Sequence, residues 1–300
     1  MTKARVFTGV GTALITPMIE SGAVDYESFG PLIDWQIDNG VDALIIAGTS
    51  GEGSTLSDQE HKDVVEYAVK RADGRVPIIA GTGSNDTAYG LQLTRGCVER
   101  GADAVLLVTP YYNKATQDGL VRLYYEYADT AGAPVILYNV PSRTGVNIEP
   151  ATYVRLAEHE NIVAVKEASG NISQITDMMA RTQGQLDLYS GNDDQIVPLL
   201  SVGGIGVISV LSNLLPQQTH DLVMAYLDGD TQRAMQMQFE YNDLIHSLFC
   251  EVNPIPVKAA MSYMGFCANA VRSPLYPMEG ANAERLRQSM VNAGIAMASR

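Results

Sequence analysis

Cysteine is scarce in this 300-residue sequence, and its three copies, Cys97, Cys250 and Cys267, form no close pair. An odd, scattered set fits reduced thiols and excludes the disulfide-rich class of small secreted proteins. The sequence also lacks the charged-then-apolar pattern of a signal peptide, and no uninterrupted apolar stretch is long enough to span a bilayer. We therefore expect a cytoplasmic protein with no membrane partner.

Basic residues are few as well, because 20 Lys and Arg face 34 Asp and Glu, for a formal net charge of −14. This charge repels phosphate backbones at long range, so we expect no nucleic-acid partner. The four histidines have no metal-ligand spacing, and the short glycine pairs lack the third glycine of a dinucleotide fingerprint. A metal or nucleotide site is therefore not expected.

Eight short apolar segments alternate with longer amphipathic segments over the first two thirds of the chain. Segments such as DALIIA at 42–47 and AVLLV at 104–108 lack apolar and polar alternation, which is typical of parallel strands buried on both faces. Ser57 stands three residues before Glu60, which indicates a capping box at a helix start. Eight successive β-then-α units predict an α/β fold, the (β/α)8 TIM barrel.

The strand signals cease after Asn213, and the remaining residues up to Arg300 have helical patterns. These exceed the single helix that would complete a barrel. We therefore predict a barrel catalytic domain over residues 1–225 and a C-terminal helical extension over residues 226–300.

A lysine ends the sixth predicted strand, where Ile162 to Val165 are apolar and Lys166 follows. Active sites of such barrels lie at the C-terminal ends of the strands. If Lys166 faces the interior, desolvation lowers its pKa and supplies a neutral amine that can attack a ketone. A lysine that reaches solvent or pairs with a carboxylate is the alternative. Charged residues are seldom buried without a reason, which favours a catalytic role.

Other strand ends carry weaker signals. Tyr138 ends the neighbouring fifth strand and could transfer protons there, although a core tyrosine is the commoner case. Arg143 follows in the loop and could bind a carboxylate with its planar fork, or it could be a solvated surface residue. The Gly48–Gly53 loop could hold a carboxylate or be a tight turn. The adjacent Tyr111 and Tyr112 more often mark an interface than a catalyst.

Five motifs carry a family resemblance across nearly the whole chain. They are GTSGEG at 48–53, YYNK at 111–114, YNVPSRTG at 138–145, VKEASG at 165–170 and NPIPVK at 253–258. With them the sequence resembles the dihydrodipicolinate synthase family of the N-acetylneuraminate lyase superfamily. That family folds as a (β/α)8 barrel with a C-terminal helical extension, in agreement with the pattern described above.

The resemblance implies a class I aldolase-type lyase. Its reaction is the Schiff-base-dependent condensation of pyruvate with L-aspartate 4-semialdehyde to 4-hydroxy-tetrahydrodipicolinate, the first committed step of diaminopimelate and lysine biosynthesis. No external cofactor is implied, because the imine nitrogen is itself the electron sink. The resemblance also implies a homo-oligomer, either a dimer or a dimer of dimers.

The resemblance also implies roles for individual residues. Lys166 forms the pyruvate imine, and Thr49 and Ser50 receive the pyruvate carboxylate; the family usually has two threonines here, so Ser50 departs from it but keeps a hydroxyl. Tyr138, Thr49 and Tyr112 match the proton relay, with Tyr112 contributed by a neighbouring subunit. The other matched substrate-binding positions are Arg143, for the carboxylate of the semialdehyde, and Gly191 and Ile208, whose backbone lines the pocket.

Many relatives are inhibited by L-lysine bound beside the paired tyrosines, and the resemblance implies only a vestigial form of that site here. His61, Asn85 and Tyr111 match it, but Tyr89 replaces a glutamate that meets the ligand's ammonium groups. A neutral phenol cannot supply that charge pairing. Two further positions also depart from the usual residues: Gly53 and Asp58, although an inward-turned Asp58 could compensate. We expect an enzyme that is insensitive, or only weakly sensitive, to L-lysine.

Two alternatives remain open. One is another class I pyruvate aldolase of the same superfamily, acting on N-acetylneuraminate or a keto-deoxy sugar acid. Arg143 argues against it, because a polyhydroxylated substrate calls for neutral groups while the semialdehyde brings a second carboxylate. The other is a non-catalytic pyruvate sensor or scaffold, since fold alone does not establish function. The intact set of Lys166, Tyr138, Tyr112 and Thr49 argues against that.

Overall fold

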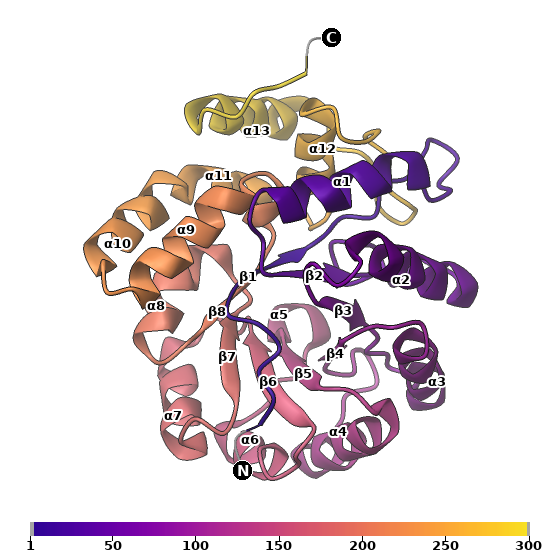
Figure 1. Cartoon of the computed structure of the whole chain (residues 1–300), viewed down its shortest axis with the longest axis vertical. Coiled ribbons are helices and arrows are strands. Elements are labelled where there is room, and N and C mark those ends of the chain that lie inside the picture. The colour runs from indigo at the N-terminus through magenta and orange to yellow at the C-terminus, as the bar shows by residue number, and fades with distance from the viewer. Residues whose placement is uncertain (1–2, 299–300) are drawn as a thin grey trace.

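The computed structural model of the chain, described here for residues 3–298, contains a closed barrel of eight parallel strands in sequential order (Figure 1). Apolar side chains fill both faces of most strands, and every residue of β2, β5, β6 and β8 is buried. The predicted (β/α)8 barrel is confirmed. The strands are β1 (Gly9–Ala13), β2 (Ala43–Ile46), β3 (Ile78–Gly81), β4 (Ala104–Val108), β5 (Val135–Asn139), β6 (Ile162–Glu167), β7 (Asp187–Ser190) and β8 (Gly206–Ser209).

Helices surround the barrel and return the chain to the start of each next strand. The predicted capping box is present at the start of α2, where Ser57 and Glu60 each bond the other's backbone N–H. The helices of this layer are α1 (Tyr26–Asp38), α2 (Asp58–Ala72), α3 (Thr87–Val98), α4 (Gln117–Ala131), α5 (Pro141–Thr144), α6 (Pro150–Leu156), α7 (Ile172–Thr182), α8 (Ile196–Ser201) and α9 (Pro216–Leu227), with short 3-10 turns η1 (Asp193–Gln195) and η2 (Leu211–Asn213).

Four further helices form the predicted C-terminal extension: α10 (Thr231–Glu240), α11 (Asn242–Leu248), α12 (Ile255–Tyr263) and α13 (Gly280–Asn292). In Figure 1, α12 and α13 lie beside α1, and the Trp35 and Phe266 ring centroids are 4.5 Å apart. Buried side chains of the extension belong to the same hydrophobic cluster as side chains of β1 and β2. The extension therefore packs on the β1 and β2 side of the barrel. The domain division at residue 225 falls inside α9 and stays a prediction.

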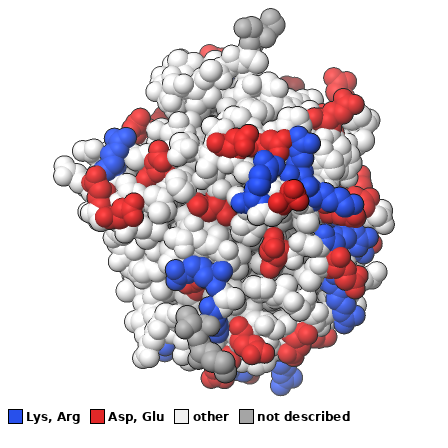
Figure 2. Space-filling view, viewed as in Figure 1, with Lys and Arg blue, Asp and Glu red and all other residues white. Residues whose placement is uncertain are grey.

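The outer surface carries mixed charge. Figure 2 shows basic side chains standing beside acidic ones on the face viewed. Arg71 and Arg75 of the α2 region, for example, both pair with Asp34 of α1. Within residues 3–298, no helix combines the length and the apolar character needed to cross a membrane.

Candidate active site

A cavity of about 1010 Å³ opens at the C-terminal ends of the barrel strands. Its lining includes residues at or just after the ends of β1, β2, β5, β6, β7 and β8, together with the loop between α11 and α12. This is the end of the barrel at which the sequence placed its candidate residues. We call it the mouth cavity.

Lys166 lies in the wall of the mouth cavity, near the end of β6, with 5% of its surface exposed. Burial lowers the pKa of its amine to about 8, an effect opposed by the negative charge of Asp193 and reinforced by the positive charge of Arg143. Within residues 3–298, no carboxylate lies within salt-bridge distance of this amine. Of the two orientations considered from the sequence, the structure has the inward one, and the amine is buried without a direct ionic partner.

Tyr138 is the registered neighbour of Lys166 across the β5–β6 pair. The lysine Nζ lies 4.3 Å from the centroid of the tyrosine ring, and both side chains line the mouth cavity. Burial raises the pKa of the Tyr138 phenol, while the Arg143 charge and a hydrogen bond with the Thr49 side chain act to lower it. The neutral phenol can therefore give and accept a proton beside the amine.

Gly191 lies beside Lys166, just after the neighbouring strand β7, where its backbone N–H donates to the Glu167 carbonyl at 2.8 Å. A Cβ at Gly191 would lie 2.7 Å from the Ala168 Cβ and 3.1 Å from the Lys166 Cε. A side chain at this position would clash with Ala168 and press on the Lys166 side chain, which favours glycine here.

The Gly48–Gly53 loop after β2 brings Thr49 and Ser50 to the mouth cavity. The loop is tight: the Gly53 N–H donates to the Gly48 carbonyl at 3.1 Å, and a Cβ at Gly53 would lie 2.1 Å from the Ala47 carbonyl oxygen. Adjacent hydroxyls on a compact turn of this kind can bind a carboxylate. Ser50 is 1% exposed, and its hydroxyl accepts a hydrogen bond from the Asn253 side-chain amide at 3.1 Å.

Arg143 lies in α5, the single turn that follows β5, and its guanidinium lines the mouth cavity. Its Nη2 donates to the main-chain carbonyl of Asn253 at 3.2 Å. Hydrogen bonds of Thr144 stabilise this turn. The Thr109 hydroxyl donates to the Thr144 hydroxyl at 2.9 Å, and Thr144 bonds the Val146 backbone. The guanidinium is thus exposed but anchored, which suits recognition of an anionic group.

Two buried carboxylates near the site were not assigned by sequence reasoning. Asp193, just after β7, accepts from the Val210 and Leu211 N–H groups at 3.0 and 2.9 Å and so ties the end of β7 to the end of β8. Its Oδ1 has no hydrogen-bond partner among residues 3–298, and burial raises its pKa. Glu167 follows Lys166 but points to the opposite side of the sheet, where it accepts from Tyr153 at 2.9 Å and from two further groups. Strand alternation could have separated Glu167 from the site, whereas no sequence pattern marked Asp193.

Two predicted residues lie away from the lining of the mouth cavity. Tyr112 is 91% exposed with a left-handed backbone (φ 69°), so it does not join Lys166 and Tyr138 within its own chain. Ile208 is fully buried on β8, and Val210 lines the cavity instead. The roles inferred for Tyr112 and Ile208 stay predictions.

Three of the four positions predicted as a vestigial L-lysine site line the same cavity. His61, Tyr89 and Tyr111 line it, while Asn85 does not. His61 is buried, its Nε2 bonds the Gly81 carbonyl at 2.9 Å, and burial lowers its pKa. Asp58 pairs with Lys62 at 2.8 Å, so the carboxylate that could have compensated for Tyr89 is already bound to a cation.

No group of three or more His, Cys, Asp or Glu side chains within residues 3–298 is placed to hold a metal ion. The polar groups that line the mouth cavity include the Lys166 amine, the Tyr138 phenol, the Thr49 and Ser50 hydroxyls and the Arg143 guanidinium. This set is suited to imine chemistry on a substrate that carries carboxylates.

Comparison with known proteins agrees with this chemistry. Residues 6–293 match the model of the Dihydrodipicolinate synthetase family. The 4-hydroxy-tetrahydrodipicolinate synthase of Lachnoclostridium phytofermentans is 52% identical over 291 residues, covering 97% of this chain and 99% of the relative. The crystal structure of dihydrodipicolinate synthase from Aquifex aeolicus superposes with a TM-score of 0.95 at 43% identity, covering 98% and 100% of the two chains. A chloride-inhibited dihydrodipicolinate synthase from Acinetobacter baumannii, in complex with pyruvate, gives 0.94 at 41% identity, covering 96% and 99%. The chain belongs to the dihydrodipicolinate synthetase family.

Proposed function

We propose that this chain condenses pyruvate with L-aspartate 4-semialdehyde to give 4-hydroxy-tetrahydrodipicolinate, with Lys166 as the covalent catalyst. The chain is a lyase of the class I aldolase type, and relatives about half identical in sequence carry the name of this activity. The observation that most directly supports the role of Lys166 is its buried, unpaired amine beside Tyr138 and the Thr49–Ser50 loop in one cavity.

The lowered pKa of Lys166 provides the nucleophile. An amine with a pKa of about 8 is roughly 10% neutral at pH 7, which is on the order of 300 times the neutral fraction of an ordinary lysine. The neutral amine adds to the pyruvate ketone, and loss of water from the carbinolamine gives the imine. Tyr138 is placed to move the protons of these steps, with Thr49 as its hydrogen-bond partner.

The imine then acidifies the pyruvate methyl group, and loss of one proton gives an enamine. The enamine carbon forms a bond to the aldehyde carbon of the semialdehyde, whose oxygen takes up a proton. The substrate's own amine next attacks the imine carbon and displaces Lys166, which closes the ring and restores the free enzyme. Thr49 and Ser50 bind the pyruvate carboxylate, while Gly191 and Ile208 provide backbone around it.

The second substrate is distinguished by its carboxylate, which we assign to Arg143. A guanidinium anchored at the cavity rim favours the semialdehyde over N-acetylneuraminate or a keto-deoxy sugar acid, whose hydroxyls need neutral partners. We further propose that the enzyme is a cytoplasmic homo-oligomer in which Tyr112 completes the proton relay of a neighbouring subunit. The exposure of Tyr112 on its own chain supports this arrangement.

Reductive trapping tests the covalent step. Incubation with pyruvate and borohydride should add a reduced pyruvate adduct to Lys166, which mass spectrometry of a proteolytic digest can locate. The buried Lys258 is the matched control, because it is ion-paired with Glu52 and should remain unlabelled. Labelling at Lys258 or Lys114 with Lys166 unmodified would contradict the proposed mechanism.

A further inference from the structure

The C-terminal extension reaches into the mouth cavity through the loop between α11 and α12. Residues 249–254 of this loop line the cavity, and Asn253 is 6% exposed. Asn253 is 203 positions from Ser50 in sequence, yet its side chain contacts the Ser50 hydroxyl. A residue outside the eight βα units thus contributes to the wall of the site.

Asn253 contacts two groups that the proposed function assigns to different substrates. Its side-chain Nδ2 donates to the Ser50 Oγ at 3.1 Å, and its main-chain carbonyl accepts from the Arg143 Nη2 at 3.2 Å. In a longer contact, at 3.5 Å, the Ser50 hydroxyl is the donor and the Asn253 Oδ1 the acceptor. In the shorter contact the Asn253 amide donates to a lone pair of Ser50, and with the amide as donor the hydroxyl proton can be donated toward the cavity.

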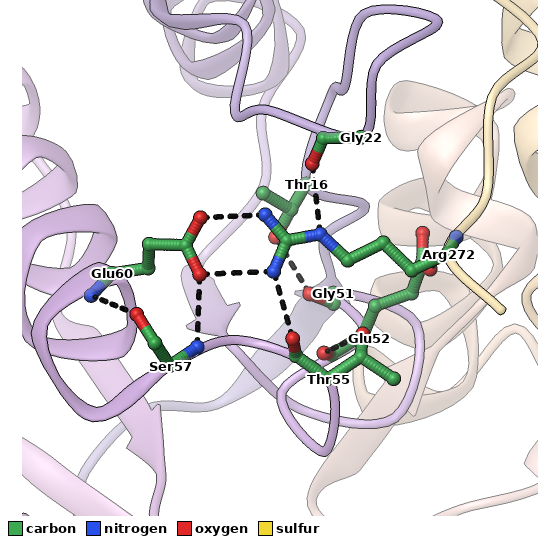
Figure 3. Close-up of polar contacts among 8 residues, drawn as sticks. All are labelled: Thr16, Gly22, Gly51, Glu52, Thr55, Ser57, Glu60 and Arg272. Carbon is green, nitrogen blue, oxygen red and sulfur yellow. Dashed lines mark hydrogen bonds and ion pairs between the residues drawn. The ribbon is translucent and has the colours of Figure 1, made fainter.

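The loop that carries Ser50 is also held from behind by the extension. Lys258 of α12, fully buried, forms an ion pair with Glu52 of the loop. Arg272 donates its backbone N–H to Glu52 at 2.8 Å and its guanidinium to the Thr55 carbonyl and to Glu60 (Figure 3). These contacts connect the loop that carries Ser50 to the same extension that carries Asn253.

We propose that Asn253 is a positioning residue. It orients the Ser50 hydroxyl toward the pyruvate carboxylate and sets the distance between this hydroxyl and the Arg143 guanidinium. The proposal rests on the proposed function and deepens it. It assigns to the C-terminal extension a part in positioning the groups that bind substrate. The Asn253 side chain acts on pyruvate through Ser50, and its main-chain carbonyl acts on the semialdehyde through Arg143. A substitution changes the side chain and keeps the carbonyl, so the two effects can be separated.

The test compares Asn253→Ala with Asn253→Asp. Alanine removes the amide that fixes Ser50 and keeps the carbonyl that holds Arg143. We expect a roughly 3- to 10-fold higher half-saturating pyruvate concentration, as for loss of one hydrogen bond, with the KM for the semialdehyde within about twofold. Aspartate keeps the shape, but its carboxylate attracts the Ser50 proton and repels the pyruvate carboxylate, so a rise of about tenfold or more is expected.

Asn282→Ala is the matched control. Asn282 of α13 donates to Glu251 in the same loop at 2.8 Å but does not line the cavity. A general loosening of the loop would raise the pyruvate requirement in this variant as well. Half-saturation is read from borohydride trapping, which needs no semialdehyde, and thermal melts check that each variant is folded.

The outcomes separate the two proposals. Absence of trapping in the natural enzyme overturns the proposed function and this inference with it. Suppose instead that the natural enzyme is trapped normally, that Asn253→Asp has the same half-saturating pyruvate concentration, and that only Asn253→Ala has a higher one. Asn253 would then only fill space. Equal rises in the requirement for both substrates, or the same effect from Asn282→Ala, would also overturn the positioning role and leave the proposed function intact.

Discussion

Two of the buried lysines, Lys166 and Lys258, have surroundings that predict opposite effects on stability when each is replaced by methionine. Lys166 is 5% exposed, with no carboxylate of residues 3–298 within salt-bridge distance, whereas Lys258 is fully buried and ion-paired with Glu52. Methionine matches the length of the lysine stem and removes the charge. We expect Lys166→Met to stabilise the folded protein at pH 7 and Lys258→Met to destabilise it.

The magnitude for Lys166 follows from its pKa. A fall from 10.5 to about 8 corresponds to a cost of about 3 kcal/mol for holding the protonated amine in the folded state at pH 7. Asp193 offsets part of the gain, because its carboxylate loses the favourable charge of Lys166. We therefore expect Lys166→Met to raise the free energy of unfolding by roughly 1–3 kcal/mol.

Lys258→Met should instead lower the free energy of unfolding, because it leaves the Glu52 carboxylate buried without its cation. Breaking a buried pair in this way typically costs about 3–5 kcal/mol. Glu52 would keep the Arg272 backbone N–H as a partner, which places the expected loss toward the lower end of that range.

The pH dependence provides a second check on Lys166. Its folded pKa is below its unfolded pKa, so between about pH 8 and 10.5 the unfolded state binds more protons and the natural enzyme gains stability as the pH rises. The advantage of Lys166→Met should be complete below pH 8 and fall by about 2 kcal/mol by pH 9.5. Urea unfolding of the natural enzyme and both variants at pH 7 and 9.5 measures these differences. A destabilised Lys166→Met protein at pH 7, or an effect independent of pH, would refute the reasoning.

Three further predictions concern the reaction and its control. Arg143→Ala should lower kcat/KM for the semialdehyde by an amount equivalent to roughly 1.5–3 kcal/mol of lost transition-state stabilisation, while pyruvate trapping stays normal. An equal loss in trapping would assign Arg143 to the first substrate or to the fold. Tyr112→Phe should bind pyruvate but lose activity, and mixing it with Lys166→Ala chains should restore activity in hybrid oligomers, unless the tyrosine acts within its own chain. L-lysine titrated into a coupled assay should inhibit weakly, because the missing charge contact at Tyr89 is worth roughly 2–5 kcal/mol; strong inhibition below 1 mM would contradict this.

The barrel could be predicted from the sequence because burial on both faces leaves a clear pattern in each strand. Segments such as β4 and β5 contain almost no polar residues, so a lysine near the end of β6 stood out in the sequence. Alternation puts Ala164 and Lys166 on the same face of β6, and the structure shows that this face is the inner one. The neighbouring position of Tyr138 followed from the sequential order of strands in a barrel.

The contribution of the extension could not be predicted in that way. Asn253 and Lys258 lie in one of the motifs that carried the family resemblance, yet no periodicity links them to Ser50 or Glu52, which are more than 200 positions away. Pairing between such distant residues depends on how the extension docks against the barrel, and that docking is set by packing spread over many side chains. Asp193 could not be predicted for a related reason, because its partners are backbone N–H groups in the loop after β8.

Lys166 and Lys258 also show why burial alone could not identify the proposed catalyst. Both amines are removed from solvent, and burial by itself lowers the pKa of each. They differ in the distance to the nearest carboxylate: Glu52 is in direct contact with Lys258, whereas Asp193 acts on Lys166 only from beyond salt-bridge distance. A contacting carboxylate holds an amine in its charged form and fixes its direction, which suits a structural link and prevents nucleophilic attack. A lysine that is buried, unpaired and placed at the end of a barrel strand has a larger neutral fraction than an ordinary lysine, at a cost to stability. That cost is expected at a functional site, where the neutral amine reacts.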